Sequence, residues 1–167
     1  VGEVAQLHGF GVDLGVGVHD GVEVALGAGW DGAVSPGTRI AQVFTSTLAA
    51  GGYSTGSGEA AEEICRPLLR AAYLGTLLAA AGLGKHRVVL TMIGCGVFGN
   101  PHPLIWESLG WALDQTDGLL SAPLEVVLNG RELNTTLGRG PLERATAARG
   151  GVLLETGGDR TVAGRRG

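Results

Sequence analysis

The residues best suited to chemistry in this sequence form a short glycine-rich stretch. Within it, Gly94, Gly96 and Gly99 follow the pattern G-x-G-x-x-G. Because glycine lacks a Cβ, several backbone N–H groups can approach one ligand closely. Phosphate is the usual ligand of such a loop when a helix begins directly after it. The pattern predicts a pyrophosphate-binding loop consisting of Gly94, Cys95, Gly96, Val97, Phe98, Gly99 and Asn100.

The context of the pattern matters more than the pattern, because 31 of the 167 residues are glycine. Chance alone gives roughly one match in such a chain. A second match does occur at residues 27, 29 and 32, but turn residues and a strand follow it. The match at 94–99 instead follows an apolar stretch and precedes a helical pattern. We therefore assign the phosphate-binding role to 94–99 alone.

Other side chains give weaker indications. Glu62 and Glu63 are adjacent carboxylates that could serve acid–base chemistry, or could simply favour the positive end of a helix. Cys95 could act as a nucleophile within the loop or merely fill space there. Phe98 fits either the face of a ribose or base, or the core beneath the loop. The four histidines and two cysteines show no metal-ligand spacing, so neither a metal nor a cofactor is expected.

Apolar periodicity predicts the elements before the loop. Alternating residues over 11–26 predict two strands joined by a hairpin turn at Asp20-Gly21. A further strand is predicted over 39–48. A long helix is predicted over 59–81, where Pro67 marks either the first turn of a later start or a kink. Its predicted buried face consists of Ile64, Leu68, Ala71, Ala72, Gly75, Leu78 and Ala79.

The elements around and after the loop predict a βαβ unit. A buried strand over 86–93 leads into the loop, a helix follows over 104–113, and another strand over 123–129. This order implies a parallel strand pair with a right-handed crossover. We therefore expect one α/β core over 1–129. The segment 130–167 holds seven of the eleven arginines and few apolar residues, so a peripheral or partly disordered segment is expected, with 163–167 disordered.

Charge and composition narrow the partners. The formal net charge of -4 is too small to favour nucleic acid or a membrane surface. No apolar run approaches the roughly 20 residues that span a bilayer, and no signal peptide is visible. Two cysteines without a disulfide pattern indicate reduced thiols, so a cytoplasmic location is expected.

The stretch 88–101, VVLTMIGCGVFGNP, resembles the second ligand loop of macro domains. It is especially similar to the G-C-G-x-F-G segment of poly(ADP-ribose) glycohydrolases. The helix before it, with Tyr73 and Leu77-Leu78, also looks like its macro-domain counterpart, so the resemblance covers about 39–129. It implies a three-layer α/β sandwich with a mixed, largely parallel central sheet flanked by helices. It also implies ADP-ribose or ADP-ribosylated protein as ligand, with the diphosphate across 94–99 and Phe98 near the distal ribose.

The sequence departs from the family in two places. The earlier Asn-rich ligand loop of macro domains has no counterpart, and the glycohydrolase pattern Gly-Gly-Gly then Gln-Glu-Glu is reduced to Gly51-Gly52 and Ala61-Glu62-Glu63. By resemblance Glu62 or Glu63 would be the catalytic acid of a hydrolase. In the ordinary macro-domain register, which we favour, the two residues only open the helix. Two other functions remain open: an NAD(P)-binding Rossmann-type oxidoreductase domain and a non-catalytic macro-like interaction domain.

Overall fold

A computed structural model describes residues 5–6, 13–27, 32, 34–49, 58–130 and 133–154. The chain divides into two units, 1–129 and 130–167, and each is described by itself. The elements of the larger unit are β1 (Ala5–Gln6), β2 (Asp13–Leu14), β3 (Gly17–Glu23), β4 (Arg39–Phe44), α1 (Glu59–Gly82), β5 (Arg87–Thr91), α2 (His102–Thr116) and β6 (Glu125–Asn129).

The βαβ unit predicted around the glycine-rich loop is confirmed. β5 and β6 pair in parallel, with Val88 opposite Val126 and Leu90 opposite Leu128, and α2 connects them. The apolar face predicted for α2 is also confirmed, because Ile105, Leu109 and Ala112 are all buried. The helix begins two residues earlier than predicted and ends three residues later.

The helix predicted over 59–81 is confirmed as α1, and its predicted buried face is right only in part: Ala71, Ala72 and Gly75 are buried as expected. Ile64 is half exposed, whereas the neighbouring positions Cys65 and Leu69 are buried. Small apolar residues surround much of this helix, so periodicity alone could not choose the buried side. Pro67 lies inside the helix rather than at its first turn. The buried residues are Ala61, Cys65, Leu69, Ala71, Ala72, Tyr73, Gly75, Thr76, Leu77 and Ala80.

The hairpin predicted at Asp20-Gly21 is wrong. Both residues lie within one strand, β3, which pairs antiparallel with β4. The register shifts between His19 and Val22, so two residues of β3 stand opposite one of β4, and Gly21 has φ 72°. This is a bulge in which glycine takes the left-handed conformation, and the same residue type would also suit a turn.

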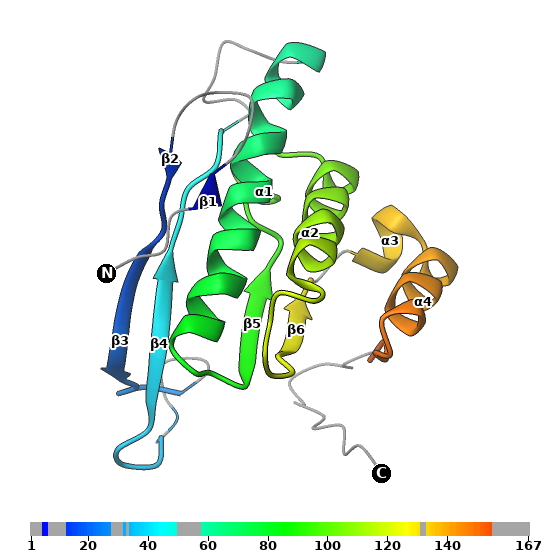
Figure 1. The fold of residues 1–167 in the computed structure, drawn as a ribbon. Coiled ribbons are helices and arrows are strands. Elements are labelled where there is room, and N and C mark those ends of the chain that lie inside the picture. Colours follow the sequence, from blue (N-terminus) through cyan, green and yellow to red (C-terminus); the bar gives the residue numbers. More distant parts are fainter. Residues whose placement is uncertain are drawn as a thin grey trace. The chain divides into compact units, whose positions relative to one another are not determined.

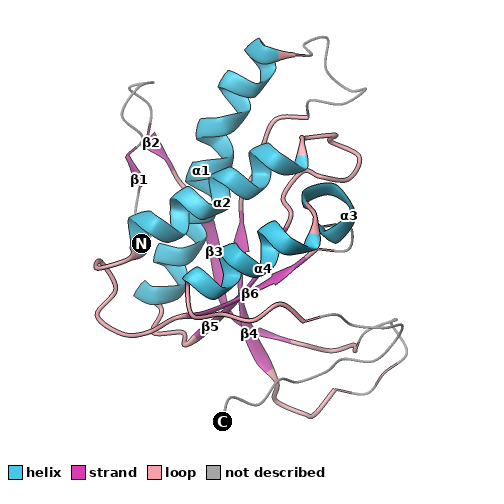
Figure 2. Ribbon diagram, turned by 90° about the vertical axis from the view of Figure 1, so that its right-hand side faces the viewer, coloured by secondary structure: helices cyan, strands magenta, loops and turns pink. Residues whose placement is uncertain are grey.

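Packing in the larger unit places α1 and α2 side by side, as Figures 1 and 2 show. Burial alternates along β5: Val88 and Leu90 are buried, whereas Arg87, Val89 and Thr91 are exposed. One face of this strand is therefore covered and the other is open. The α/β class is confirmed, and the described strands hydrogen-bond only in pairs: β1 with β2, β3 with β4, and β5 with β6.

By length and composition, α1 is the single described helix that could cross a membrane. That evidence is weak, since half of its most apolar window is buried and core helices pass the same test. Its two arginines, Arg66 and Arg70, are both bound to a carboxylate of α2. We therefore describe α1 as the core helix of the larger unit.

The smaller unit contains two helices, α3 (Leu133–Leu137) and α4 (Arg139–Ala148). Order here is greater than the composition suggested, because Leu133 and Leu142 are buried and Arg139 pairs with Glu143 one helical turn later. Gly138, with φ 79°, separates the helices. The disorder predicted for 163–167 lies outside the described residues.

Candidate functional site

The candidate site is the loop at residues 92–101, between the end of β5 and the start of α2 (Figure 1). β5 is parallel to β6, and ligands of open α/β sheets bind at the carboxyl ends of such strands. The strand–loop–helix order predicted for the G-x-G-x-x-G segment is thus confirmed. The loop has the position that a phosphate-binding loop requires.

Hydrogen bonds within the loop fix its shape. The Cys95 amide donates to the Met92 carbonyl at 3.2 Å, and the Gly99 amide donates to the Gly96 carbonyl at 2.9 Å. The Asn100 amide donates to the Gly94 carbonyl at 2.9 Å and so closes the loop. Gly94 and Gly99 have φ values of 79° and 65°, which residues with a side chain rarely adopt. Two of the three pattern glycines are therefore required by the backbone itself.

Gly94 is also required by its surroundings. A Cβ at this position would overlap Nδ2 of Asn100 and lie 2.8 Å from Cγ2 of Thr47. A Cβ on Gly96 would meet no atom within 4 Å. Gly94 is therefore structural, whereas the open space at Gly96 is available to a ligand.

The tip of the loop carries three consecutive backbone amides, those of Gly96, Val97 and Phe98. Among the described residues, none accepts a hydrogen bond from the N–H groups of Gly96, Val97 or Phe98. All three residues are exposed, Val97 by 71% and Phe98 by 42%. Phe98 is therefore not a core aromatic beneath the loop, which leaves the surface role that we considered for it. The tip offers neutral N–H donors to solvent in one short stretch, as an anion-binding loop does.

Tyr73 of α1 anchors the start of the loop. Its hydroxyl donates to the Thr91 carbonyl at 2.9 Å and accepts from the Ile93 amide at 3.1 Å. The side chain is fully buried, and this burial raises the pKa of Tyr73 to about 12 despite the bond from Ile93. The hydroxyl therefore stays protonated and continues to satisfy two part-buried backbone groups.

Behind the loop lies a polar cluster that sequence reasoning missed. Asn100 is 2% exposed, and its Nδ2 donates to Oγ1 of Thr47 at 3.4 Å. The same Thr47 hydroxyl lies 3.5 Å from Sγ of Cys65 on α1. Nothing in the sequence links Thr47 to Asn100, which lies 53 positions away. The cluster joins the segment after β4, the start of α1 and the loop.

The paired carboxylates stand at the beginning of α1. Glu62 lies in its first turn and is partly buried, while Glu63 is exposed. No described residue forms a hydrogen bond or ion pair with either side chain. Cys65, one turn further along, reaches the polar cluster behind the loop. The structure therefore brings the first turns of α1 to the loop without showing a contact from either glutamate.

Comparison of the chain with protein-family models, curated proteins and solved structures found no match. Among the described residues, no group of three or more histidine, cysteine, aspartate or glutamate side chains could hold a metal ion.

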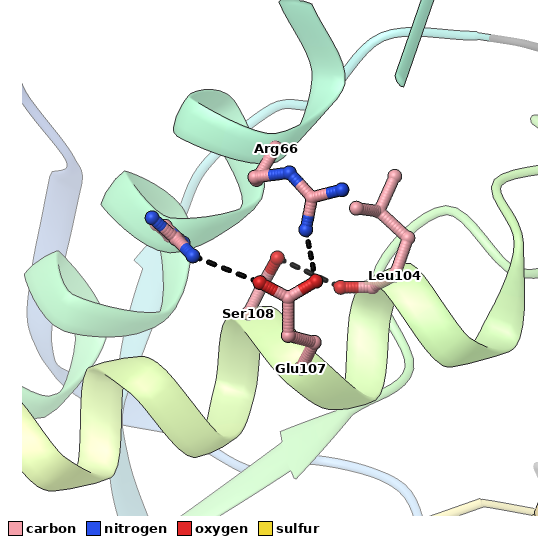
Figure 3. Close-up of polar contacts among 5 residues, drawn as sticks. Arg66, Leu104, Glu107 and Ser108 are labelled. Atoms are coloured by element: carbon pink, nitrogen blue, oxygen red, sulfur yellow. Dashed lines mark hydrogen bonds and ion pairs between the residues drawn. The ribbon is translucent and has the colours of Figure 1, made fainter. Parts of the chain in front are cut away.

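A charged cluster holds α1 and α2 together below the loop (Figure 3). Glu107 of α2 binds Arg66 through one oxygen, and the other oxygen lies 2.8 Å from Nη2 of Arg70. Arg70 also lies over the ring of Trp111, 5.1 Å from its centroid. Burial acts to raise the pKa of Glu107, but the hydrogen bonds from the two arginines outweigh it and hold this pKa below its ordinary value. The cluster fixes the helix that follows the loop.

Proposed function

We propose that the chain binds ADP-ribose, free or attached to protein, through the diphosphate at residues 94–100. One observation carries the proposal: a cross-braced loop at the end of a parallel strand presents the amides of Gly96, Val97 and Phe98 without a described acceptor. A diphosphate supplies several acceptor oxygens within the span of one such loop.

Electrostatics at the start of α2 favour an anion weakly. The first turn carries no acidic residue, and the positive end of the helix faces the loop. Pro101 and Pro103 lack N–H groups, so the first turn adds few donors. The loop itself contains neither lysine nor arginine. Affinity therefore depends on the loop amides and on contacts with the rest of the ligand.

Phe98 supports a ligand that has a sugar or base beside its diphosphate. The ring is 42% exposed on the same tip as the unpartnered amides. Aromatic faces commonly pack against apolar or π surfaces of ligands. In the proposed complex Phe98 lies near the distal ribose. The finer fold that we propose for the larger unit is a three-layer sandwich with a mixed, largely parallel central sheet flanked by helices.

The Rossmann-type alternative is less well supported. A dinucleotide-binding unit needs an acidic residue at the carboxyl end of the strand after the loop helix. That strand, β6, ends at Asn129, and its one acidic residue, Glu125, stands at the opposite end in an ion pair with Arg87. NAD is therefore a comparator ligand in the test rather than the expected one.

The deciding experiment is isothermal titration calorimetry with ADP-ribose, with NAD, ADP and AMP as comparators. The wild-type chain is compared with Gly96→Glu, whose side chain enters open space and places a negative charge at the amide tip. Gly96→Ala is the matched control. We expect selective ADP-ribose binding that Gly96→Glu abolishes and Gly96→Ala weakens only slightly. Stronger binding of NAD than of ADP-ribose would reverse the ranking, and binding of none would favour an interaction domain.

Hydrolysis of the ADP-ribose linkage is a second step of the proposal. It assigns Glu62 or Glu63 to polarise the glycosidic bond or position a water molecule, because the first turns of α1 adjoin the polar cluster behind the loop. The double variant Glu62→Gln, Glu63→Gln tests this role with an ADP-ribosylated protein as substrate. Lost turnover with retained ADP-ribose binding supports it. Unchanged turnover ends it.

A further inference from the structure

An open groove of about 390 Å³ lies between β4 and β5. One wall consists of Val43, Phe44 and Thr45 at the end of β4, and Thr76 of α1 contributes to the lining. The other wall is β5 and the residues after it, from Val89 to Gly94. The groove therefore follows two strands and ends at the first glycine of the candidate loop.

Neither strand pairs with a further strand among the described residues, although the Tyr73 hydroxyl already binds the Thr91 carbonyl and the Ile93 amide on the β5 wall. In the described part of the chain β4 pairs only with β3, and β5 pairs only with β6. β4 and β5 also run in the same direction (Figure 1). An unpaired strand edge presents backbone N–H and C=O groups that a further strand can satisfy. Two such edges border one groove, so an extended backbone is the chemistry that fits it best.

Charge and polarity narrow the occupant. None of the residues that line the groove is charged. Two of the lining residues are exposed, Phe44 by 57% and Val89 by 63%. A charged segment would lose hydration here without gaining a partner. A neutral, largely apolar strand would not lose hydration of a charge in this groove.

We propose that one extended, uncharged peptide segment of a partner protein inserts between β4 and β5 by strand addition. The inserted strand joins the pairs β3–β4 and β5–β6 into one mixed five-stranded sheet. Its backbone binds both edges, and its alternate side chains cover Val89 and Phe44. The inference is independent of the proposed ADP-ribose binding, because it uses the strand edges rather than the loop amides.

The test selects, from a library of random displayed peptides, those that bind the full chain. Peptides that also bind the variant Val89→Lys are then removed. A lysine at Val89 places a charge on the wall of the groove, which blocks edge pairing. Val127→Lys is the matched control: Val127 stands opposite Val89 in the β5–β6 pair, is also exposed, and belongs to neither groove wall. Thermal unfolding of both variants verifies that each is folded.

We expect uncharged peptides with alternating apolar residues to be enriched. A synthetic copy should bind about tenfold more weakly to Val89→Lys and less than twofold more weakly to Val127→Lys. Hydrogen exchange should slow at 43–45 and 89–92 when the peptide binds, whereas the Ile93 amide already donates to Tyr73. Failure to enrich such peptides, equal effects of the two variants, or protection elsewhere would each overturn the proposal. A wild-type dimer that dissociates in the variant Val89→Lys would also overturn it, because the occupant of the groove would then be a second copy of the chain.

Discussion

Gly94 combines two constraints, a left-handed backbone and contact with Asn100 and Thr47. We expect Gly94→Ala to lower the free energy of unfolding by about 1–3 kcal/mol, because strain and displacement of Asn100 add together. Gly96→Ala, with open space around its Cβ, should change it by less than about 0.5 kcal/mol. Urea unfolding followed by circular dichroism compares the two. Equal losses would show that the tight packing around Gly94 is not energetically important.

Tyr73 leads to a prediction at alkaline pH. The folded pKa is about 12 and the ordinary value is 10.0, so the unfolded chain loses its proton first. The stability that Tyr73 contributes is complete below pH 10 and is lost as pH rises towards 12. Tyr73→Phe should lower the free energy of unfolding at pH 7 by about 1–2 kcal/mol, since two part-buried backbone groups lose their partner. Above pH 10 the gap between the variant and the wild type should narrow in urea titrations; a constant gap would contradict the prediction.

At the residue scale, the sequence predicted the loop but not the contacts that support it. The strand, the glycine pattern and the helix are adjacent in the chain, so their order can be predicted from the sequence. The hydrogen-bond partners of Asn100 and Tyr73 cannot be predicted in this way. Thr47 lies 53 residues from Asn100, and Thr91 lies 18 residues from Tyr73. Side chains that meet only after folding leave no periodic signal. Phe98 was open to two interpretations for the same reason.

At the scale of the elements, Glu107 of α2 links the two helices through its ion pairs with Arg66 and Arg70 of α1. Its pKa lies below the ordinary value of 4.5, so its contribution is present above pH 4.5 and is lost as pH falls further. Glu107→Gln should reduce stability at pH 7 by about 1 kcal/mol, a modest figure because the cluster is partly exposed. Urea unfolding at pH 7 and pH 3 should show the difference shrink in acid.

The matched control for Glu107 is Glu125→Gln, which removes a single exposed ion pair with Arg87. We expect a smaller loss at pH 7, about 0.5 kcal/mol or less. An equal or larger loss for Glu125→Gln would show that two arginines on one carboxylate stabilise the helix pair no better than one surface pair does.

Element type was predictable where one reading suited the residues, and failed where two did. The apolar stretch before the loop fitted only a strand. The spacing of Ile105, Leu109 and Ala112 fitted only a helix with one buried side. Gly21 suited both a hairpin turn and a bulge, and the pairing of β3 with β4 decided between them. The buried side of α1 was predicted only in part, because apolar residues surround much of the helix. α3 and α4 were missed since each buries a single leucine.

At the scale of the whole molecule, the two units should differ in local stability. The buried apolar residues of the larger unit are numerous, whereas in the described part of the smaller one they are Leu133 and Leu142. So small a core supplies little free energy against local opening. Native-state hydrogen exchange should show α3 and α4 exchanging at least about tenfold faster than β5 and the middle of α1. Equal protection of both units would contradict this expectation.

Gly94 belongs to two places at once: it lines the groove between β4 and β5, and it opens the loop that we assign to the diphosphate. Any peptide that settles in the groove and any nucleotide held by the loop would thus share a wall. If binding of one ligand changes the affinity for the other through this wall, that coupling is reciprocal. Whatever factor the peptide imposes on nucleotide affinity, the nucleotide must impose on the peptide. A shift of Gly94 on binding of either molecule would then alter the affinity for the other.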